Sequence, residues 1–229
     1  MARDQGLKLV AYPDRETLLR AVAAAIAVDL AGVVQAQGWA SFSVPGGTTP
    51  GPVFDLLADL PLDWAHIAVF LNDERWVGED SPRSNTRLVR ERLLVGRAAA
   101  ARLIPLYADA ATPELRLAEL AAGLAPHLPV SVLLLGMGAD MHTASLFPGA
   151  DHLAAALAED APALMALRAQ AAGEPRITLT APVLRAARHV HILITGAEKR
   201  AAVSRAAELP PLQAPVRVVL DHATIHWAE

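Results

Sequence analysis

Residues 133–149 of this chain have the sequence LLLGMGADMHTASLFPG. Its apolar start is typical of a buried parallel strand, which ends at two glycines that allow a sharp turn and a close approach to a ligand. Open α/β sheets bind ligands at the carboxyl ends of their strands. Asp140 and His142 follow the glycines and form a candidate catalytic unit, an imidazole oriented by a carboxylate. The alternative is an ordinary loop in which both side chains are solvated.

The composition is typical of a globular protein with ample material for a core. Of the 229 residues, 53% are hydrophobic and 19% are charged. The net charge of -4 argues against a general nucleic-acid binder. The chain has no cysteine, which excludes disulfides, thiolate nucleophiles and Cys-ligated zinc and fits a cytoplasmic protein.

The Ala-rich segment at residues 18–34 imitates a signal peptide in composition, but Asp29 interrupts it. No apolar run approaches the roughly 20 residues that are needed to cross a bilayer. We therefore expect a soluble protein without a membrane span. The large apolar side chains of the segment recur at the spacing of a buried amphipathic helix: Leu18, Val22, Ile26, Leu30 and Val33.

Apolar, β-rich runs alternate with helical patterns along most of the chain. This alternation predicts an α/β fold in a single domain over residues 1–229, with a Rossmann-like, mostly parallel sheet and helices on both faces. The Ala-rich stretch 154–172 is expected to form a loop-and-helix excursion. Predicted strands are 7–12, 40–44, 66–71, 130–136, 176–180, 189–195 and 216–220, and predicted helices are 14–37, 49–58, 85–94, 113–122 and 197–208.

A second candidate segment, SVPGGTTP at residues 43–50, joins a predicted strand to a predicted helix. Pro50 is expected to be the first helical residue, a position that proline favours. Glycines and hydroxyls at a helix N-terminus expose N–H groups to an anion, and a phosphate is the natural ligand. The alternative is a capped helix start with glycines for the turn. The phosphate candidates are Gly46, Gly47, Thr48 and Thr49.

A third segment, FLNDERWV at residues 70–77, introduces charges abruptly at the end of a strand. If this strand is parallel to its neighbours, Asp73, Glu74 and Arg75 emerge on the same rim as His142. Arg75 could clamp a carboxylate, a phosphate or a developing oxyanion, and the alternative is a local surface ion pair. Residues 84–86 form a predicted helix cap close enough to brace Asp73 or Glu74.

Two further cations are candidate ligands, and the histidines do not form a convincing metal site. Lys199, in TGAEK at residues 195–199, is expected near a helix N-terminus, where a cation is unfavourable unless an anion compensates it. Arg176 is a weaker candidate. His189 and His191 point the same way on a predicted strand, but such residues are more often packed or hydrogen-bonded than metal-bound. We expect no metal.

Together these segments resemble the 6-phosphogluconolactonase family. That family carries a Gly-Gly-Ser/Thr-Thr-Pro loop, an Asp-Glu-Arg segment and a Gly-Met-Gly-x-Asp-Gly-His-Thr-Ala-Ser-Leu-Phe-Pro loop. Residues 46–50, 73–75 and 136–148 match them, as do RITLT at 176–180 and TGAEK at 195–199. The resemblance implies a phosphosugar lactone of the oxidative pentose phosphate pathway as substrate, water as nucleophile and no cofactor. We expect a monomer, and we expect no nucleic-acid or membrane partner.

The resemblance also implies roles for the candidate residues. A histidine has an ordinary pKa near about 6.5 and suits a general base at neutral pH, so His142 is assigned this role with Asp140 as its orienting partner. Arg75 would stabilise the oxyanion or hold the sugar acid. A covalent route through Ser145 is not favoured, because no nucleophile-elbow pattern surrounds it. The substrate and phosphate ligands would be Gly46, Gly47, Thr48, Thr49, Lys199, Arg176 and Gly138.

The chain departs from the family pattern at Met141, where glycine is expected, and at Pro45, where serine is usual. If the backbone at residue 141 has a positive φ, methionine is strained there. The second hypothesis is a glucosamine-6-phosphate isomerase/deaminase. That family needs a carboxylate where Phe147 stands, and it carries a tyrosine where Arg75 stands. A third is a non-catalytic phosphosugar-binding protein, which only Met141 supports.

Overall fold

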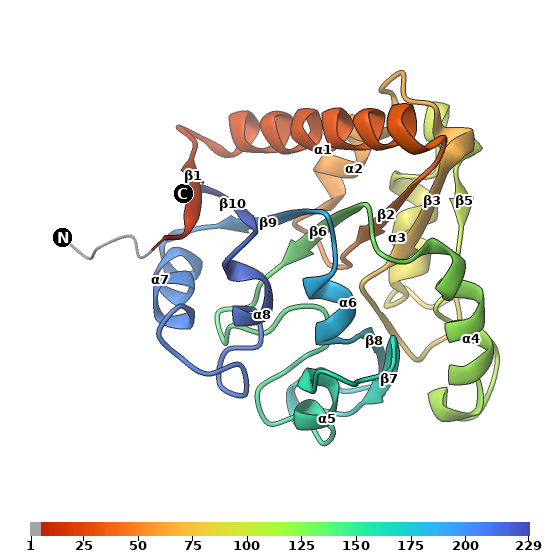
Figure 1. Ribbon diagram of the computed structural model, residues 1–229, viewed down its shortest axis with the longest axis vertical. Helices are drawn as coiled ribbons and strands as arrows, with labels where there is room; N and C mark the ends of the chain where they lie inside the picture. Colours follow the sequence, from red (N-terminus) through yellow and green to blue (C-terminus); the bar gives the residue numbers. More distant parts are fainter. Residues whose placement is uncertain (1–5) are drawn as a thin grey trace.

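A seven-stranded parallel sheet organises the computed structural model, which describes residues 6–229. Helix α1 lies on one side of this sheet and α7 and α8 lie on the other (Figure 1), so the predicted α/β class is confirmed. In spatial order the strands are β1 (Lys8–Ala11), β10 (Thr224–Ala228), β9 (His189–Thr195), β6 (Val132–Gly136), β2 (Ala40–Val44), β3 (Ile67–Leu71) and β5 (Arg102–Leu103).

Helix α1 (Arg15–Gln37) begins and ends at the signals that its sequence carries. The carboxylate of Asp14 accepts a hydrogen bond from the Thr17 amide at 2.7 Å, and Gly38 ends the helix with φ of 80°. Its buried face packs against the sheet, as the helical spacing predicted. The buried side chains are Leu18, Val22, Ala23, Ile26, Leu30 and Val33.

The length of α1 corrects one expectation. At 23 residues the helix is long and apolar enough, by length and composition, to cross a membrane, whereas we expected no run of that size. Core helices of soluble proteins and signal sequences pass the same test. Buried side chains recur along α1 on the face that packs against the sheet, and 33% of its apolar window is buried.

A second, antiparallel sheet of three strands forms where β3 ends. Strand β4 (Asp73–Arg75) pairs with β8 (Arg176–Leu179), which pairs with β7 (Leu164–Leu167). The predicted strand at 176–180 is therefore real, but it lies outside the parallel sheet. The backbone of Asn72 joins the two sheets. Its N–H donates to the carbonyl of Val44, and its C=O accepts from the N–H of Leu179, both at 2.8 Å.

One predicted strand is wrong. Residues 216–220 contain the short helix α8 (Arg217–Leu220), and the strand that enters the sheet is β10, which follows it. The β-branched run suggested a strand, but one helical turn buries Val216, Val219 and Leu220 at three- and four-residue spacing. The stretch 154–172 forms the expected helix, α5 (Leu153–Leu157), but also contains β7.

The other helices lie close to their predicted positions. They are α2 (Gly51–Ala58), α3 (Asn85–Arg92), α4 (Leu117–Leu124) and α7 (Ala197–Ala206). Pro50 is the cap of α2 and not its first helical residue. The helix expected at 113–122 begins as a 3-10 turn, Pro113–Leu115, before α4. The sequence patterns missed β5 and α6 (Ala181–Arg185).

Candidate active site

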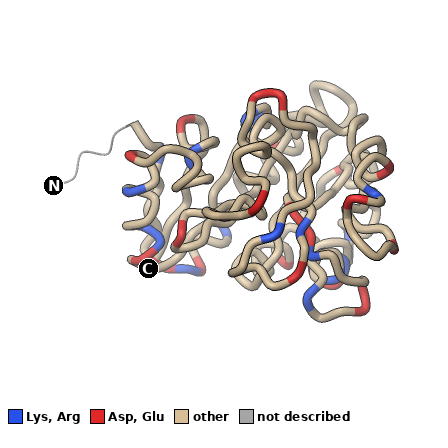
Figure 2. The backbone as a smooth tube through the Cα atoms, turned by 90° about the horizontal axis from the view of Figure 1, so that it is seen from below, with Lys and Arg blue, Asp and Glu red and all other residues tan. Residues whose placement is uncertain are grey.

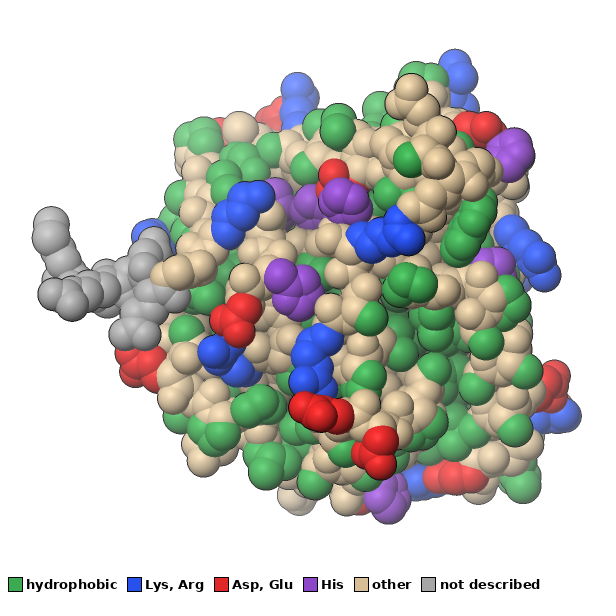
Figure 3. All heavy atoms as spheres, viewed as in Figure 1, with side chains coloured by type: hydrophobic (Ala, Val, Ile, Leu, Met, Phe, Trp, Pro, Cys, Tyr) green, Lys and Arg blue, Asp and Glu red, His purple; other side chains and the backbone are tan. Residues whose placement is uncertain are grey.

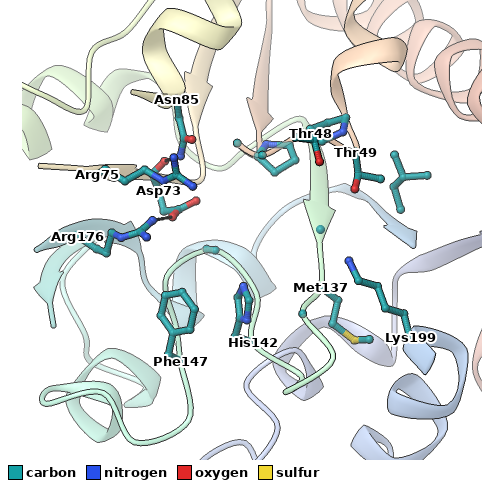
Figure 4. A pocket seen from close by; sticks show the side chains of 18 residues that line it. Thr48, Thr49, Asp73, Arg75, Asn85, Met137, His142, Phe147, Arg176 and Lys199 are labelled. Carbon is teal, nitrogen blue, oxygen red and sulfur yellow. Dashed lines mark hydrogen bonds and ion pairs between the residues drawn. The ribbon is translucent and has the colours of Figure 1, made fainter. Parts of the chain in front are cut away.

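The predicted site segments meet in one cavity of about 380 Å³. It lies at the carboxyl ends of β2 and β6, beside β4 and the first turn of α7 (Figure 4). Asp140 does not line the cavity but bonds to His142, which does. The predicted lining residues are Gly46, Gly47, Thr48, Thr49, Arg75, Gly138, His142, Arg176 and Lys199, and the cavity adds Asp73, Asn85, Met137 and Phe147.

The loop after β6 folds back on itself and brings His142 to the cavity. The amide of Gly138 donates to the carbonyl of His142 at 3.1 Å, and the hydroxyl of Thr143 donates to the carbonyl of Gly136 at 2.9 Å. A Cβ at Gly138 would overlap both the Asp140 carboxylate and the His142 ring. Glycine at residue 138 is therefore a requirement of the close packing between loop and imidazole.

His142 and Asp140 form the predicted pair. The Nδ1 atom of His142 lies 2.6 Å from Oδ1 of Asp140, and the hydrogen bond to His142 lowers the pKa of the Asp140 carboxyl. Because Nδ1–H donates to the carboxylate, Nε2 is the nitrogen with a free lone pair. The ring of Phe147 lies 4.2 Å from the His142 ring, centroid to centroid, and limits its rotation. The pair has the geometry of an oriented base.

Two guanidinium groups converge beside one carboxylate on the opposite wall of the cavity (Figure 4). Arg75 and Arg176 are paired across β4 and β8, and the Nη1 atom of Arg176 lies 3.7 Å from Oδ2 of Asp73. Burial lowers the pKa of the Arg176 guanidinium. The Nε atoms of both arginines are buried, and within residues 6–229 neither has a hydrogen-bond partner. The wall carries a net positive charge suited to an anionic substrate.

Strand alternation separates the charges of β4. Asp73 and Arg75 line the cavity, whereas Glu74 points to the opposite side, so the expectation that all three reach the rim is wrong for Glu74. Its carboxylate accepts hydrogen bonds from the amides of Arg75, Asn85 and Thr86 and from the hydroxyls of Ser84 and Thr86. Burial raises the pKa of Glu74, while these donors favour its charged form. Glu74 thus anchors the N-terminus of α3, which confirms the predicted brace.

The glycine loop and Lys199 form a third wall. Gly47 has φ of 86°, which glycine adopts without strain, and a Cβ at Gly46 would overlap the side chain of Asn85. Thr48 and Thr49 follow at the start of α2, and the Lys199 side chain extends toward them from α7 (Figure 4). Backbone amides, hydroxyls and an ammonium group therefore surround one end of the cavity.

Ser145 is not placed to act as a nucleophile. It is fully buried, its hydroxyl donates to the Asp73 carboxylate, and its amide donates to the hydroxyl of Thr178 at 3.1 Å. The serine connects the His142 loop to β4 and β8. This position agrees with the expectation that the reaction does not pass through Ser145.

Met141 adopts the left-handed conformation that the family glycine suggested, with φ of 67°. Its amide donates to the carbonyl of Gly138 at 2.9 Å, and its carbonyl accepts from the amide of Val216 at 3.1 Å. These bonds hold the strained backbone in place. A methionine in this region costs about 1 kcal/mol more than a glycine.

Met141→Gly should therefore leave activity level or raise it. Strain relief is offset by the greater entropy of the unfolded chain and by lost side-chain packing, so the free energy of unfolding should change by no more than about 1 kcal/mol. Unfolding curves, and steady-state kinetics with the phosphosugar lactone that the sequence leads us to expect, measure both effects. Ala144→Gly, at φ of 49° with a smaller side chain to lose, is the matched control for strain. A folded Met141→Gly protein with little activity would show that methionine is adapted to this pocket.

The chain is similar in sequence and in fold to several known proteins. A family model described as glucosamine-6-phosphate isomerases/6-phosphogluconolactonase matches residues 13–227. A 6-phosphogluconolactonase of Mesorhizobium japonicum is 41% identical over 225 residues, which cover 95% of this chain and 94% of the relative. One of Rhizobium meliloti is 39% identical, covering 95% and 97%. The crystal structure of a Shewanella baltica 6-phosphogluconolactonase has a TM-score of 0.95 at 33% identity, covering 98% of this chain and 99% of that chain.

Proposed function

This chain belongs to the glucosamine-6-phosphate isomerase/6-phosphogluconolactonase family, and from that membership we propose that it is a 6-phosphogluconolactonase. It would hydrolyse 6-phospho-D-glucono-1,5-lactone to 6-phosphogluconate in the oxidative pentose phosphate pathway, as one domain over residues 1–229. The observation that carries the proposal is the Asp140–His142 pair at 2.6 Å, set opposite two arginines in one cavity. That the protein acts as a cytoplasmic monomer without metal or cofactor stays a prediction.

The proposed reaction begins with a water molecule between His142 and the lactone carbonyl. Nε2 of His142 takes a proton from the water as its oxygen bonds to the carbonyl carbon, and the carbonyl electron pair moves onto oxygen. Asp140 stabilises the imidazolium that forms, and Arg75 stabilises the oxyanion. The intermediate then re-forms the carbonyl and breaks the bond to the ring oxygen. That oxygen takes the proton from His142, and the new carboxylic acid loses its proton to solvent.

The phosphate would bind away from the reacting carbon, against Gly46, Gly47, Thr48, Thr49 and Lys199. Backbone amides at the start of α2 suit phosphate oxygens, and the Lys199 ammonium adds a charge-assisted hydrogen bond. Arg176, beside Asp73 and Arg75, would help to neutralise the negative charge that develops on the lactone carbonyl oxygen. Binding energy from the phosphate orients the lactone against His142 and Arg75.

The two other hypotheses have less support at the site. An isomerase/deaminase needs a carboxylate at residue 147, but Phe147 packs its ring on His142 there. The carboxylate that does face the cavity, Asp73, is engaged by Ser145 and lies next to Arg176. Assaying the purified protein with 6-phosphogluconolactone and with glucosamine 6-phosphate separates the three hypotheses, after subtraction of spontaneous lactone hydrolysis. Turnover of the lactone alone is expected. Turnover of the amino sugar, or of neither compound, would overturn the proposal.

The phosphate assignment is tested by ligand protection. 6-Phosphogluconate should raise the midpoint of thermal unfolding, because a ligand that binds the native state stabilises it. Lys199→Ala should weaken binding by about tenfold, since one charge-assisted hydrogen bond contributes about 1.5 kcal/mol. Arg205→Ala, an exposed cation on the same helix, is the matched control. Equal protection of wild-type and Lys199→Ala proteins would place the phosphate elsewhere.

A further inference from the structure

A second cavity, of about 510 Å³, lies at the opposite edge of the parallel sheet from the candidate active site. Lys8, His189 and Thr224 line it, and each is the first residue of its strand, β1, β9 and β10. The active-site cavity lies at the carboxyl ends of parallel strands, so the two openings are on opposite edges. Figure 3 shows histidine and basic side chains gathered below α1 on this face.

The inner wall of this cavity contains two buried histidines, His191 and His226, which belong to a chain of hydrogen bonds. The hydroxyl of Tyr12 lies 2.9 Å from Nδ1 of His226, whose Nε2 lies 3.0 Å from Nδ1 of His191. Nε2 of His191 lies 2.8 Å from Oδ2 of Asp29. Because Asp29 accepts, each bond has one direction: His191 donates to Asp29, His226 donates to His191, and Tyr12 donates to His226.

In this chain of hydrogen bonds the imidazoles are neutral, and the Asp29 carboxylate already has hydrogen-bond partners. Burial lowers the pKa of His191, and burial together with the charges of His191 and Lys8 lowers that of His226 to about 4. The second oxygen of Asp29 lies 3.3 Å from Nδ1 of His189. Within residues 6–229, no three acidic, histidine or cysteine side chains are placed to hold a metal ion. The one carboxylate that lines the cavity thus already has two imidazole partners, and its side chain is 23% exposed.

The two cations at the opening of this cavity have no carboxylate partner in the described part of the chain. Lys8 and Arg188 are exposed, and neither has a carboxylate within 4.0 Å in the described part of the chain. Elsewhere, acidic and basic residues are interspersed (Figure 2), and nine of the 17 arginines in the described part of the chain lie within 4.0 Å of a carboxylate. Examples are Arg20–Glu16, Arg87–Glu91, Arg116–Glu119, Arg168–Glu114 and Arg217–Asp221.

We propose that this cavity is a second ligand site, which binds a small metabolite carrying a phosphate or carboxylate group. Lys8 and Arg188 hold the anionic group by charge-assisted hydrogen bonds, and the hydroxyl of Thr224 and the ring of His222 supply further polar contacts at the wall. The hydrogen-bonded imidazoles keep the wall rigid and uncharged. The site does not depend on the function proposed for the first cavity, because no residue lines both.

The test follows the two cavities separately in one titration. Inorganic phosphate, and citrate in a second arm, are added to the full-length protein while imidazole resonances are recorded by ¹H–¹⁵N NMR. His189 and His222 report on the second cavity, and His142 reports on the first. We expect saturable shifts of His189 and His222 with at least one of the two anions. In the double variant Lys8→Ala/Arg188→Ala, the dissociation constant of the anion, read from the shifts of His189 and His222, should rise by about 100-fold. Each lost contact should account for about tenfold.

The controls decide between a site and general attraction of anions. Arg205→Ala removes an exposed cation that lines neither cavity and should leave the titration of His189 and His222 unchanged. An unchanged response of His142 in the double variant shows that it is folded. The proposal is overturned if the resonances of His189 and His222 do not shift with either anion. It is equally overturned if the dissociation constant of the anion, read from His189 and His222, is the same in the wild-type and double-variant proteins.

Discussion

Replacing His142 with alanine should lower the turnover number by roughly 10²–10⁴-fold, the usual contribution of a general base. The imidazole lies at the cavity with one nitrogen held by Asp140, so its loss removes the proton acceptor and leaves the carboxylate too far back to replace it. Packing changes little, because the ring is partly exposed at 29% of its side-chain surface. The measurement is steady-state hydrolysis of 6-phosphogluconolactone, corrected for the spontaneous reaction, with far-UV circular dichroism as a check of the fold.

The chain offers a matched control for this experiment. His66 lies 2.8 Å from the carboxylate of Asp63 in a similar pair, but it is exposed and lines neither cavity. His66→Ala should hydrolyse the lactone at the wild-type rate. If His142→Ala also keeps nearly the full rate above background, His142 is not the base.

Arg75→Ala should lower kcat by about 10²–10³-fold, which is the effect of removing one oxyanion donor. The guanidinium is fixed by a hydrogen bond from Nη1 to the carbonyl of Arg83 at 2.6 Å, while its buried Nε has no partner within the described residues. It is therefore preorganised to receive negative charge. Arg75→Lys should restore little activity, because an ammonium does not reproduce the planar fork of donors.

The separation of kcat from KM identifies the role of Arg75. A loss in kcat indicates stabilisation that is realised only in the transition state, whereas a rise in KM alone indicates that Arg75 holds the ground-state substrate. Arg83→Ala is the neighbouring control, because its exposed side chain pairs with Glu174 and its backbone carbonyl remains available to Arg75. Wild-type kinetics in Arg75→Ala would reduce this residue to a structural cation.

The parallel sheet and the loop that carries Asp140 and His142 were predictable because their signals are local. Apolar runs that end in glycine mark β6 and its neighbours, and the Asp-x-His spacing at residues 140–142 is enough to bring the two side chains together across one tight turn. The region after β9 lacked such a signal. A β-branched run at 216–220 and the alternating run at 224–228 compete for one place in the sheet, and tertiary packing decides in favour of the second.

The sequence predicted Asp73 and Arg75 at this rim and residues 84–86 as a brace, but it did not reveal the long-range pairing that sets how these residues are oriented. Asp73 and Arg75 face the cavity because β4 pairs with β8, about 100 residues later in the chain, in a register that sets Arg75 opposite Arg176. Asn85 reaches the cavity because its backbone amide donates a hydrogen bond to the Glu74 carboxylate, which fixes the start of α3. Neither the β4–β8 register nor the approach of Asn85 to the cavity has a periodic signature in the sequence, so these two details followed only from the folded structure.

The distribution of lysine has a practical consequence. Lys8 and Lys199 are the only lysines of a chain that otherwise uses arginine, and each lines a different cavity. An acylating reagent that modifies primary amines thus has two side-chain targets, one at each edge of the sheet. Peptide mass spectrometry after mild labelling would read the occupancy of both cavities at once from the protection of these two positions. The native chain therefore carries its own pair of chemical reporters, and no residue has to be introduced to follow ligand traffic.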